Sequence, residues 1–330
     1  MKSKEILSAL EKEARQNKES GSYLFYGDKR VDLLFYALEF SKMVMTKDIK
    51  EEVEKEKIYK RIKNFQHPDI EIINRKNENI KIDEIRKIIY ESIESPYSSP
   101  KKIFILSGIE NIRKESSNAL LKILEEPPKN VYFILLSRSL DIIPTLKSRT
   151  LKFHLESLDN NELGVNKEIY YFFDGNENDI KNYKKSGILI EEYENFIDSP
   201  EKVIESIREM KDFEKMEKEE KEEKEDTDPE NDIKNEIEII IKYNKSVEYI
   251  SRKIRFLALE EVYKLISEIE GEFKNERESL ISFLGKVIVT SRLSVNGEEL
   301  KKLINLKNSI RNNVNVRSVL FNFFDILSKF

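Results

Sequence analysis

The sequence of 330 residues contains no cysteine, which excludes disulfide bonds and thiolate metal sites. No apolar run approaches the roughly 18 residues that a membrane-spanning helix requires. The start of the chain, Met1 to Glu5, lacks the apolar core of a secretory signal peptide. The only histidines are His67 and His154, far apart in the sequence and without cysteine partners. We therefore expect a cytoplasmic protein with no membrane span and no metal.

The chain also lacks a strong excess of either charge. Its formal net charge is −5, although 37% of its residues are charged. The segment 214–230 holds ten acidic residues against four lysines, so the rest of the chain is close to neutral. A near-neutral body gives no overall attraction for nucleic acid. Any DNA contact must come from a local patch or from assembled neighbours.

Apolar runs typical of buried strands alternate with helical patterns through residues 20–155. The expected strands are 22–26, 70–73, 103–106, 131–136 and 151–154. The expected helices are 31–44, 47–65, 82–93 and 112–126, the last of which ends at Pro127 and Pro128. Strands alternating with helices predict right-handed crossovers and a doubly wound parallel sheet. Strand patterns disappear after Asp159.

The most specific motif lies near the middle of the chain. Residues 117–128 read Ser-Asn-Ala-Leu-Leu-Lys-Ile-Leu-Glu-Glu-Pro-Pro and are followed later by Ser148-Arg149. This combination resembles the AAA+ subunits of the bacterial DNA polymerase III clamp loader. His67-Pro68-Asp69 and residues 315–320 also resemble segments of that family. The resemblance covers most of residues 20–155 and, weakly, the final hundred.

The resemblance implies an AAA+ fold in several parts. Residues 1–157 would form the αβ domain, a parallel sheet flanked by helices. A small helical lid domain would follow over 158–208, and 209–232 would be an acidic charged linker or helix. Residues 233–330 would form an all-helical collar through which subunits assemble.

Parallel αβ units invite a search for a phosphate loop after the first strand. The signature is Gly, four residues, then Gly-Lys-Ser/Thr, whose amides, ammonium and hydroxyl bind phosphates and magnesium. Gly27 is in place, but Asp32, Leu33 and Leu34 stand at the last three positions. Two leucines cannot neutralise a triphosphate, and Asp32 would repel it. The loop is therefore predicted to be degenerate.

Two further nucleotide-binding features are missing. After the strand at 103–106, AAA+ ATPases place paired acids, whereas this chain has Ser107 and Gly108, followed only by Glu110. The family's lid arginine would fall near Asn178, where the segment 176–180 has none. We therefore expect no productive ATP binding, no hydrolysis by this chain alone and no cofactor.

Among clamp-loader subunits, the resemblance is to the delta-prime type, which characteristically lacks a working phosphate loop. That type keeps a Ser-Arg-Cys segment, here Ser148-Arg149-Thr150. The family's usual four-cysteine zinc module is absent, and Thr150 replaces the motif's cysteine. The resemblance implies that Arg149 is an arginine finger acting in trans, with Ser148 shaping its turn. Arg113 and Lys114 are candidates for facing DNA, although a solvated basic pair is equally compatible with the sequence.

As partners the resemblance implies gamma/tau and delta subunits, with the beta clamp and primer-template DNA reached through the assembled complex. The chain would be a non-hydrolysing stator, a rigid subunit that holds the ring for loading the clamp. Two alternatives stay open: a gamma-type ATPase with a divergent site, and a relic AAA+ adaptor outside replication.

Overall fold

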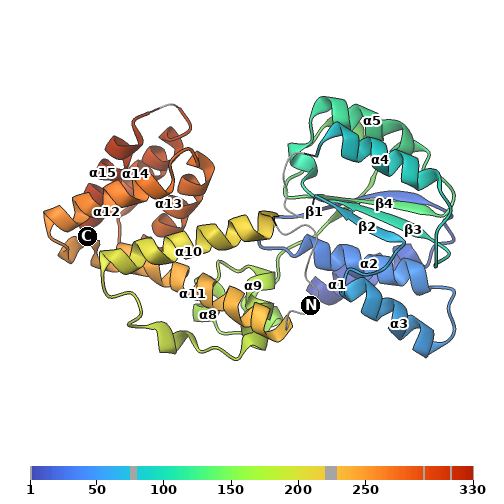
Figure 1. Ribbon diagram of the computed structural model, residues 1–330, viewed down its shortest axis with the longest axis horizontal. Coiled ribbons are helices and arrows are strands. Elements are labelled where there is room, and N and C mark those ends of the chain that lie inside the picture. The colour runs from blue at the N-terminus through green and yellow to red at the C-terminus, as the bar shows by residue number, and fades with distance from the viewer. Residues whose placement is uncertain (1, 75–79, 220–228, 293, 313, 330) are drawn as a thin grey trace. The chain divides into compact units, whose positions relative to one another are not determined.

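The computed structural model describes every residue except 1, 75–79, 220–228, 293, 313 and 330. The chain divides into two compact units, Met1–Lys181 and Asn182–Phe330 (Figure 1). The first unit contains the sheet and the second is helical. No described helix is long and apolar enough to cross a membrane.

The first unit is built on a five-stranded sheet in which every pairing is parallel. Its strands are β1 (Gly21–Tyr26), β2 (Ile70–Ile73), β3 (Lys102–Leu106), β4 (Val131–Ser137) and β5 (Leu151–His154). Their order in the sheet is β2-β3-β4-β1-β5, so β1 lies between β4 and β5. The chain passes from β1 to β2 at one edge of the sheet and returns through β3 and β4 to the neighbour of β1. The last strand, β5, lies on the other side of β1. Open parallel sheets bind ligands at the carboxyl ends of strands near such a reversal.

Helices cover both faces of the sheet (Figure 1). They are α1 (Lys2–Ala14), α2 (Leu33–Thr46), α3 (Glu52–Lys63), α4 (Ile82–Ile93), η1 (Ile109–Asn111), α5 (Lys114–Glu125) and α6 (Pro144–Ser148). Three short helices follow: α7 (Asn160–Leu163), α8 (Lys167–Phe172) and α9 (Glu177–Ser186). The boundary between the two units falls within α9.

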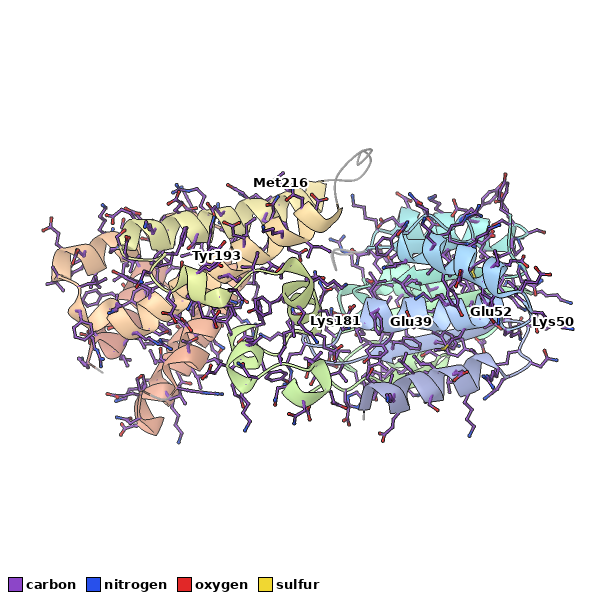
Figure 2. The ribbon with its side chains drawn as sticks, turned by 90° about the horizontal axis from the view of Figure 1, so that it is seen from below. Glu39, Lys50, Glu52, Lys181, Tyr193 and Met216 are labelled. Atoms are coloured by element: carbon purple, nitrogen blue, oxygen red, sulfur yellow. The ribbon has the colours of Figure 1, made fainter. Side chains whose placement is uncertain are left out.

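The strands separate two apolar cores because successive side chains alternate between the faces. Tyr23 and Phe25 of β1 join the core under α1, α2 and α3, whereas Leu24 joins the core under α4 and α5. In β4, all seven residues are buried. Charged side chains cover the outer surface of the first core, including Glu39 and Glu52, which form ion pairs with Lys42 and Lys55 (Figure 2).

The second unit packs around one apolar core. Its elements are η2 (Ile190–Tyr193), α10 (Pro200–Glu219), α11 (Pro229–Lys253), η3 (Ile254–Phe256), α12 (Leu259–Glu272), α13 (Arg277–Ser291), α14 (Gly297–Ser309) and α15 (Val316–Ser328). Val203 and Ile207 of α10 share this core with residues of α11 to α15. The lid and collar boundaries expected from the sequence stay predictions. Part of the acidic tract, 220–228, lies outside the described residues.

The parallel sheet flanked by helices confirms the predicted fold class. The element bounds differ in two instructive places. The helix expected from residue 31 begins at Leu33, because the Asp32 side chain caps it by accepting from the Phe35 amide. The helix expected from residue 112 begins at Lys114, because Ile112 and Arg113 have extended backbone conformations after η1.

Candidate functional site

The connection from β1 to α2, residues 27–32, lies at the carboxyl end of β1, where a phosphate loop would be found. Gly27 is required there by packing: a Cβ on this residue would lie 2.5 Å from the carbonyl oxygen of Leu155. The Gly27 amide donates to the Ser137 carbonyl at 3.2 Å. This glycine therefore fits closely between the ends of β4 and β5.

The amides of this loop are used within the loop and the first turn of α2. The Arg30 amide donates to Asp28 Oδ1 at 2.9 Å, and the Val31 amide to the Asp28 carbonyl at 3.2 Å. The Phe35 amide donates to Asp32 Oδ1 at 3.0 Å. Asp32 thus acts as a helix cap at the position where a phosphate loop has its second glycine. Amides engaged in this way are not directed at a phosphate.

The two leucines that replace lysine and serine or threonine belong to the apolar core. Leu33 is 3% exposed, and Leu34 packs partly buried against the same cluster. Neither side chain presents a donor to the loop. The apolar core of α1 and α2 therefore extends to the position where the lysine of a phosphate loop would stand.

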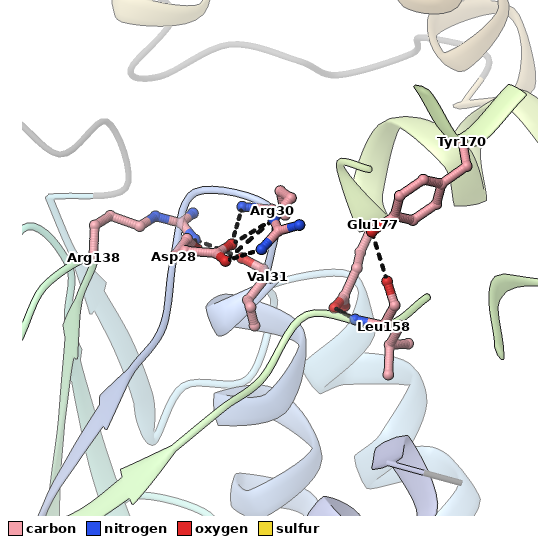
Figure 3. A network of polar contacts seen from close by, with 7 residues as sticks. All are labelled: Asp28, Arg30, Val31, Arg138, Leu158, Tyr170 and Glu177. Carbon is pink, nitrogen blue, oxygen red and sulfur yellow. Dashed lines mark hydrogen bonds and ion pairs between the residues drawn. The ribbon is translucent and has the colours of Figure 1, made fainter. Parts of the chain in front are cut away.

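Charged side chains of the loop and of the segment after β4 lie close together, as Figure 3 shows. Arg138, directly after β4, donates through Nη1 to the carbonyl oxygens of Val31 at 2.5 Å and Asp28 at 3.2 Å. The Asp28 carboxylate accepts from Arg30, with Nε at 3.1 Å and Nη2 at 2.5 Å. This pairing with Arg30 lowers the pKa of the Asp28 carboxyl. The Asp28 carboxylate and two carbonyl oxygens of the loop are thus each paired with an arginine side chain.

The start of α9 also contacts this loop. The Glu177 amide donates to the Arg30 carbonyl at 2.9 Å, while the Glu177 side chain is fully buried. Its Oε1 accepts from the Leu158 amide at 3.1 Å. Burial raises the pKa of the Glu177 carboxyl. The backbone amide of Asn178, where the resemblance would put the lid arginine, donates to the Asn176 side-chain oxygen at 3.0 Å as a turn contact.

The segment after β3 supplies one carboxylate, and this carboxylate is engaged. Ser107 is buried, and Gly108 has a φ of +74°, a conformation that favours glycine. Glu110 Oε2 accepts from Ser137 Oγ at 3.0 Å and from the Arg138 amide at 3.2 Å. Glu110 therefore fixes the end of β4, close to the arginine that bonds the β1–α2 loop.

Arg149 directly follows α6, away from these contacts. Its Nε donates to Glu125 Oε2 at 2.9 Å and its Nη1 to the Thr145 carbonyl at 3.3 Å. Nη2 has no hydrogen-bond partner among the described residues. Ser148 Oγ donates to the Thr145 carbonyl at 3.0 Å, which closes the turn of α6. The buried Thr150 hydroxyl donates to the Leu146 carbonyl at 3.0 Å.

The other residues singled out by sequence take separate places. Arg113 and Lys114 are exposed at the start of α5, where Arg113 is the N-cap residue. His154 lies on β5, and its ring stacks on Tyr26 with centroids 4.9 Å apart. His67 is buried in the turn before β2. Among the residues that the structure describes, no group of histidines and carboxylates could hold a metal.

The turn at His67 and Asp69 organises the loop after α4. The Asp69 carboxylate accepts from the amides of Tyr97, Ser98 and Ser99 at 2.5, 2.8 and 2.8 Å. His67 Nε2 lies 3.1 Å from Ser99 Oγ. The His-Pro-Asp segment therefore fixes the conformation of residues 97–99, and Tyr97 itself is 88% exposed on this fixed loop.

Sequence reasoning missed Arg138, the Asp28–Arg30 pair and the contacts of Glu177. Arg138 comes directly after a buried strand, so its position at the carboxyl edge of the sheet could have been noticed. Its partners are 107 and 110 residues away in the chain, and no local pattern marks them.

Sequence comparison relates the first part of the chain to a known protein family. The family described as "DNA polymerase III, delta subunit" matches residues 2–159. This match covers slightly less than half of the chain. The delta' subunit of Bacillus subtilis (strain 168) is 29% identical over 153 residues, 45% of this chain and 46% of the relative.

Two other relatives carry the delta' and gamma subunit names. The delta' subunit of Buchnera aphidicola subsp. Schizaphis graminum is 40% identical over 91 residues, 27% of this chain and 28% of the relative. The gamma subunit of the same organism is 37% identical over 84 residues, 25% and 23%. The chain thus spans less than half the length of each of these curated relatives.

A solved structure shares the fold over nearly the whole chain. It is the DNA polymerase III gamma subunit-related protein of Thermotoga maritima MSB8. The TM-score is 0.62 with 18% sequence identity, over 98% of each chain. At this identity the likeness establishes a shared fold alone.

Proposed function

We propose that this chain is the delta-prime subunit of a sliding-clamp loader, a stator that does not hydrolyse ATP itself. One observation carries the proposal: the loop that would bind phosphate in cis is engaged by the chain's own groups. Asp28 and Asp32 take loop and helix amides, and Arg138 bonds two loop carbonyls. A nucleotide would have to displace these contacts and compensate for the missing lysine. The chain would therefore act through neighbouring subunits.

We propose that Arg149 supplies the contribution in trans, as an arginine finger for the ATP site of a gamma/tau neighbour. Its ion pair involves Glu125, whose side chain is 59% exposed. Exposed ion pairs are worth only about 0.2–1 kcal/mol, so redirecting this guanidinium costs little. A finger supplied in trans accelerates phosphoryl transfer by about 10³-fold or more. The gain available at a neighbouring γ-phosphate is thus much larger than the cost of leaving Glu125.

A second proposed contact of the assembled complex is with DNA. Arg113 and Lys114 begin α5, whose first-turn amides and helix dipole favour a phosphate. We propose that this end of α5 faces primer-template DNA in the assembled complex. Replacing both residues by glutamine should weaken DNA stimulation of ATP turnover, whereas Lys122→Gln in the last turn of α5 should not. Equal behaviour of the two variants would assign Arg113 and Lys114 to an ordinary solvated surface.

Reconstitution with gamma/tau and delta subunits tests the proposed function. We expect the chain to join the complex and DNA-stimulated ATP turnover to depend on its presence. A chain that never associates with these subunits would support the adaptor alternative. A chain that hydrolyses ATP without partners would support the gamma-type alternative, which the relatives named gamma keep in view.

A further inference from the structure

Two distant segments of the first unit meet at the β1–α2 loop. The end of β4 contributes Arg138, whose Nη1 bonds the carbonyls of Asp28 and Val31. The first turn of α9 contributes the Glu177 amide, which bonds the Arg30 carbonyl. Three loop carbonyls are therefore held by donors from two distant segments. In a nucleotide-binding loop, bound phosphate supplies much of the organising interaction.

Side chains connect the first turn of α9 to the start of α2. Lys181 Nζ lies 3.7 Å from Glu177 Oε2 and 3.8 Å from Asp32 Oδ2, the carboxylate that caps α2. The same ammonium lies 4.2 Å from the centroid of the Phe35 ring. Lys181 thus interacts with two residues at the beginning of α2 and one on its own helix. A partly buried charge of this kind is weakly screened by salt.

The buried position of Glu177 makes these contacts interdependent. Its side chain has no exposure, one oxygen accepts from the Leu158 amide, and Lys181 is the cation near the other oxygen. A buried carboxylate left without a cation is costly. Removing the Lys181 ammonium would therefore weaken the hold of α9's first turn on both the loop and residue 158.

We propose that Arg138 and the Glu177–Lys181 pair form an internal clasp that takes the mechanical place of a nucleotide. The clasp holds the first turn of α9 on the β1–α2 loop in the presence or absence of ATP. This inference rests on the proposed function, because a chain that cycles with ATP needs this loop to open. It adds the residues that keep the N-terminal unit in one conformation.

Hydrogen exchange on the full-length chain tests the clasp. We expect the amides of residues 28–35 and 177–181 to be protected equally with and without ATP and magnesium. In Arg138→Met and Lys181→Met these amides should exchange at least about tenfold faster, while strands β3 and β4 keep their protection. Lys185→Met, at an exposed position further along α9, is the matched control and should exchange like the parent.

Conservative variants separate the clasp from a general loss of structure. Arg138→Lys and Lys181→Arg keep the positive charge and should retain most of the protection. The clasp is wrong if the methionine variants exchange like the parent, or if β3 and β4 lose protection together with the loop. ATP binding by the parent chain would instead refute the proposed function, so the two failures are distinguishable.

Discussion

The β1–α2 loop and the Arg149 turn lie in the same unit and differ in how their polar groups are partnered. In the loop, amides, carbonyls and charges are paired with groups from β4, α2 and α9. At the Arg149 turn, the guanidinium donates to one carboxylate and one carbonyl. Its Nη2 has no hydrogen-bond partner among the described residues. The first arrangement resists a ligand, whereas the second can be redirected at small cost.

This difference separates two roles that an AAA+ subunit ordinarily combines. Binding a nucleotide in cis requires open amides and a lysine, and here those positions are closed by Asp32 and filled by Leu33. Acting on a neighbour's nucleotide requires only a positioned guanidinium. A chain can therefore lose the first role while keeping the second.

The largest expected effect concerns Arg149. In the reconstituted complex, Arg149→Ala should lower ATP turnover at the adjoining site by about 10³-fold, because a cation is removed from the developing phosphoryl charge. Assembly, followed by size-exclusion chromatography, should be unchanged. Lys147→Ala on the same short helix is the control and should keep normal turnover. Unchanged ATP turnover in Arg149→Ala would contradict the proposal that Arg149 acts on a neighbouring subunit.

The closed loop should respond strongly to a restored lysine. Leu33→Lys should destabilise the isolated chain by about 3 kcal/mol or more, because the substitution puts an ammonium into an apolar core. Leu34→Lys should cost less than half as much, since Leu34 is only partly buried. Urea unfolding measures both. A small and equal cost would indicate that the loop opens easily and would weaken the contrast with Arg149.

The closed region should also carry a pH dependence. Because burial raises the pKa of Glu177, the native state keeps this proton at pH values where the unfolded chain has lost it. The unfolding free energy should therefore fall as pH rises from the ordinary glutamate range, about 4.3, through the raised pKa. Glu177→Gln should lack this decline. The exposed control Glu168→Gln should keep it, and identical pH profiles for all three chains would contradict the buried-charge account.

The smallest effect is expected at Glu125. Glu125→Gln should change the free energy of unfolding by less than about 1 kcal/mol, because Glu125 is exposed and Arg149 is partly exposed. ATP turnover by the complex should be preserved. A large loss of turnover would mean that Glu125 positions Arg149, and the turn would then be as tightly organised as the loop.

The fold was predictable where local pattern and burial agree. The strands at 70–73 and 151–154 and the helix at 82–93 have the bounds expected from their apolar residues. The start of α2 was misjudged because a cap, Asp32, decides it rather than hydrophobic spacing. The absence of a phosphate-loop lysine at Leu33 was readable directly from the sequence.

The contacts that replace this lysine were not predictable. Arg138 reaches the loop only because β1 and β4 are neighbours in the sheet, although 107 residues separate Arg138 from Val31. In the sequence, Glu177 and Lys181 are only four residues apart on one helix, and the proximity of Lys181 to Asp32 and Phe35 arises from tertiary structure. The sequence alone shows that no lysine stands at position 33. The contacts of Arg138, Glu177 and Lys181 with the loop and α2 depend on tertiary structure.

Titration of the purified chain with a fluorescent ATP analogue and magnesium tests the central claim most directly. We expect no saturable binding in the micromolar range, for the parent chain and for Arg149→Ala alike. Saturable micromolar binding to the parent chain would contradict it, because the β1–α2 loop would then have to release Arg138 and accept a triphosphate beside Leu33.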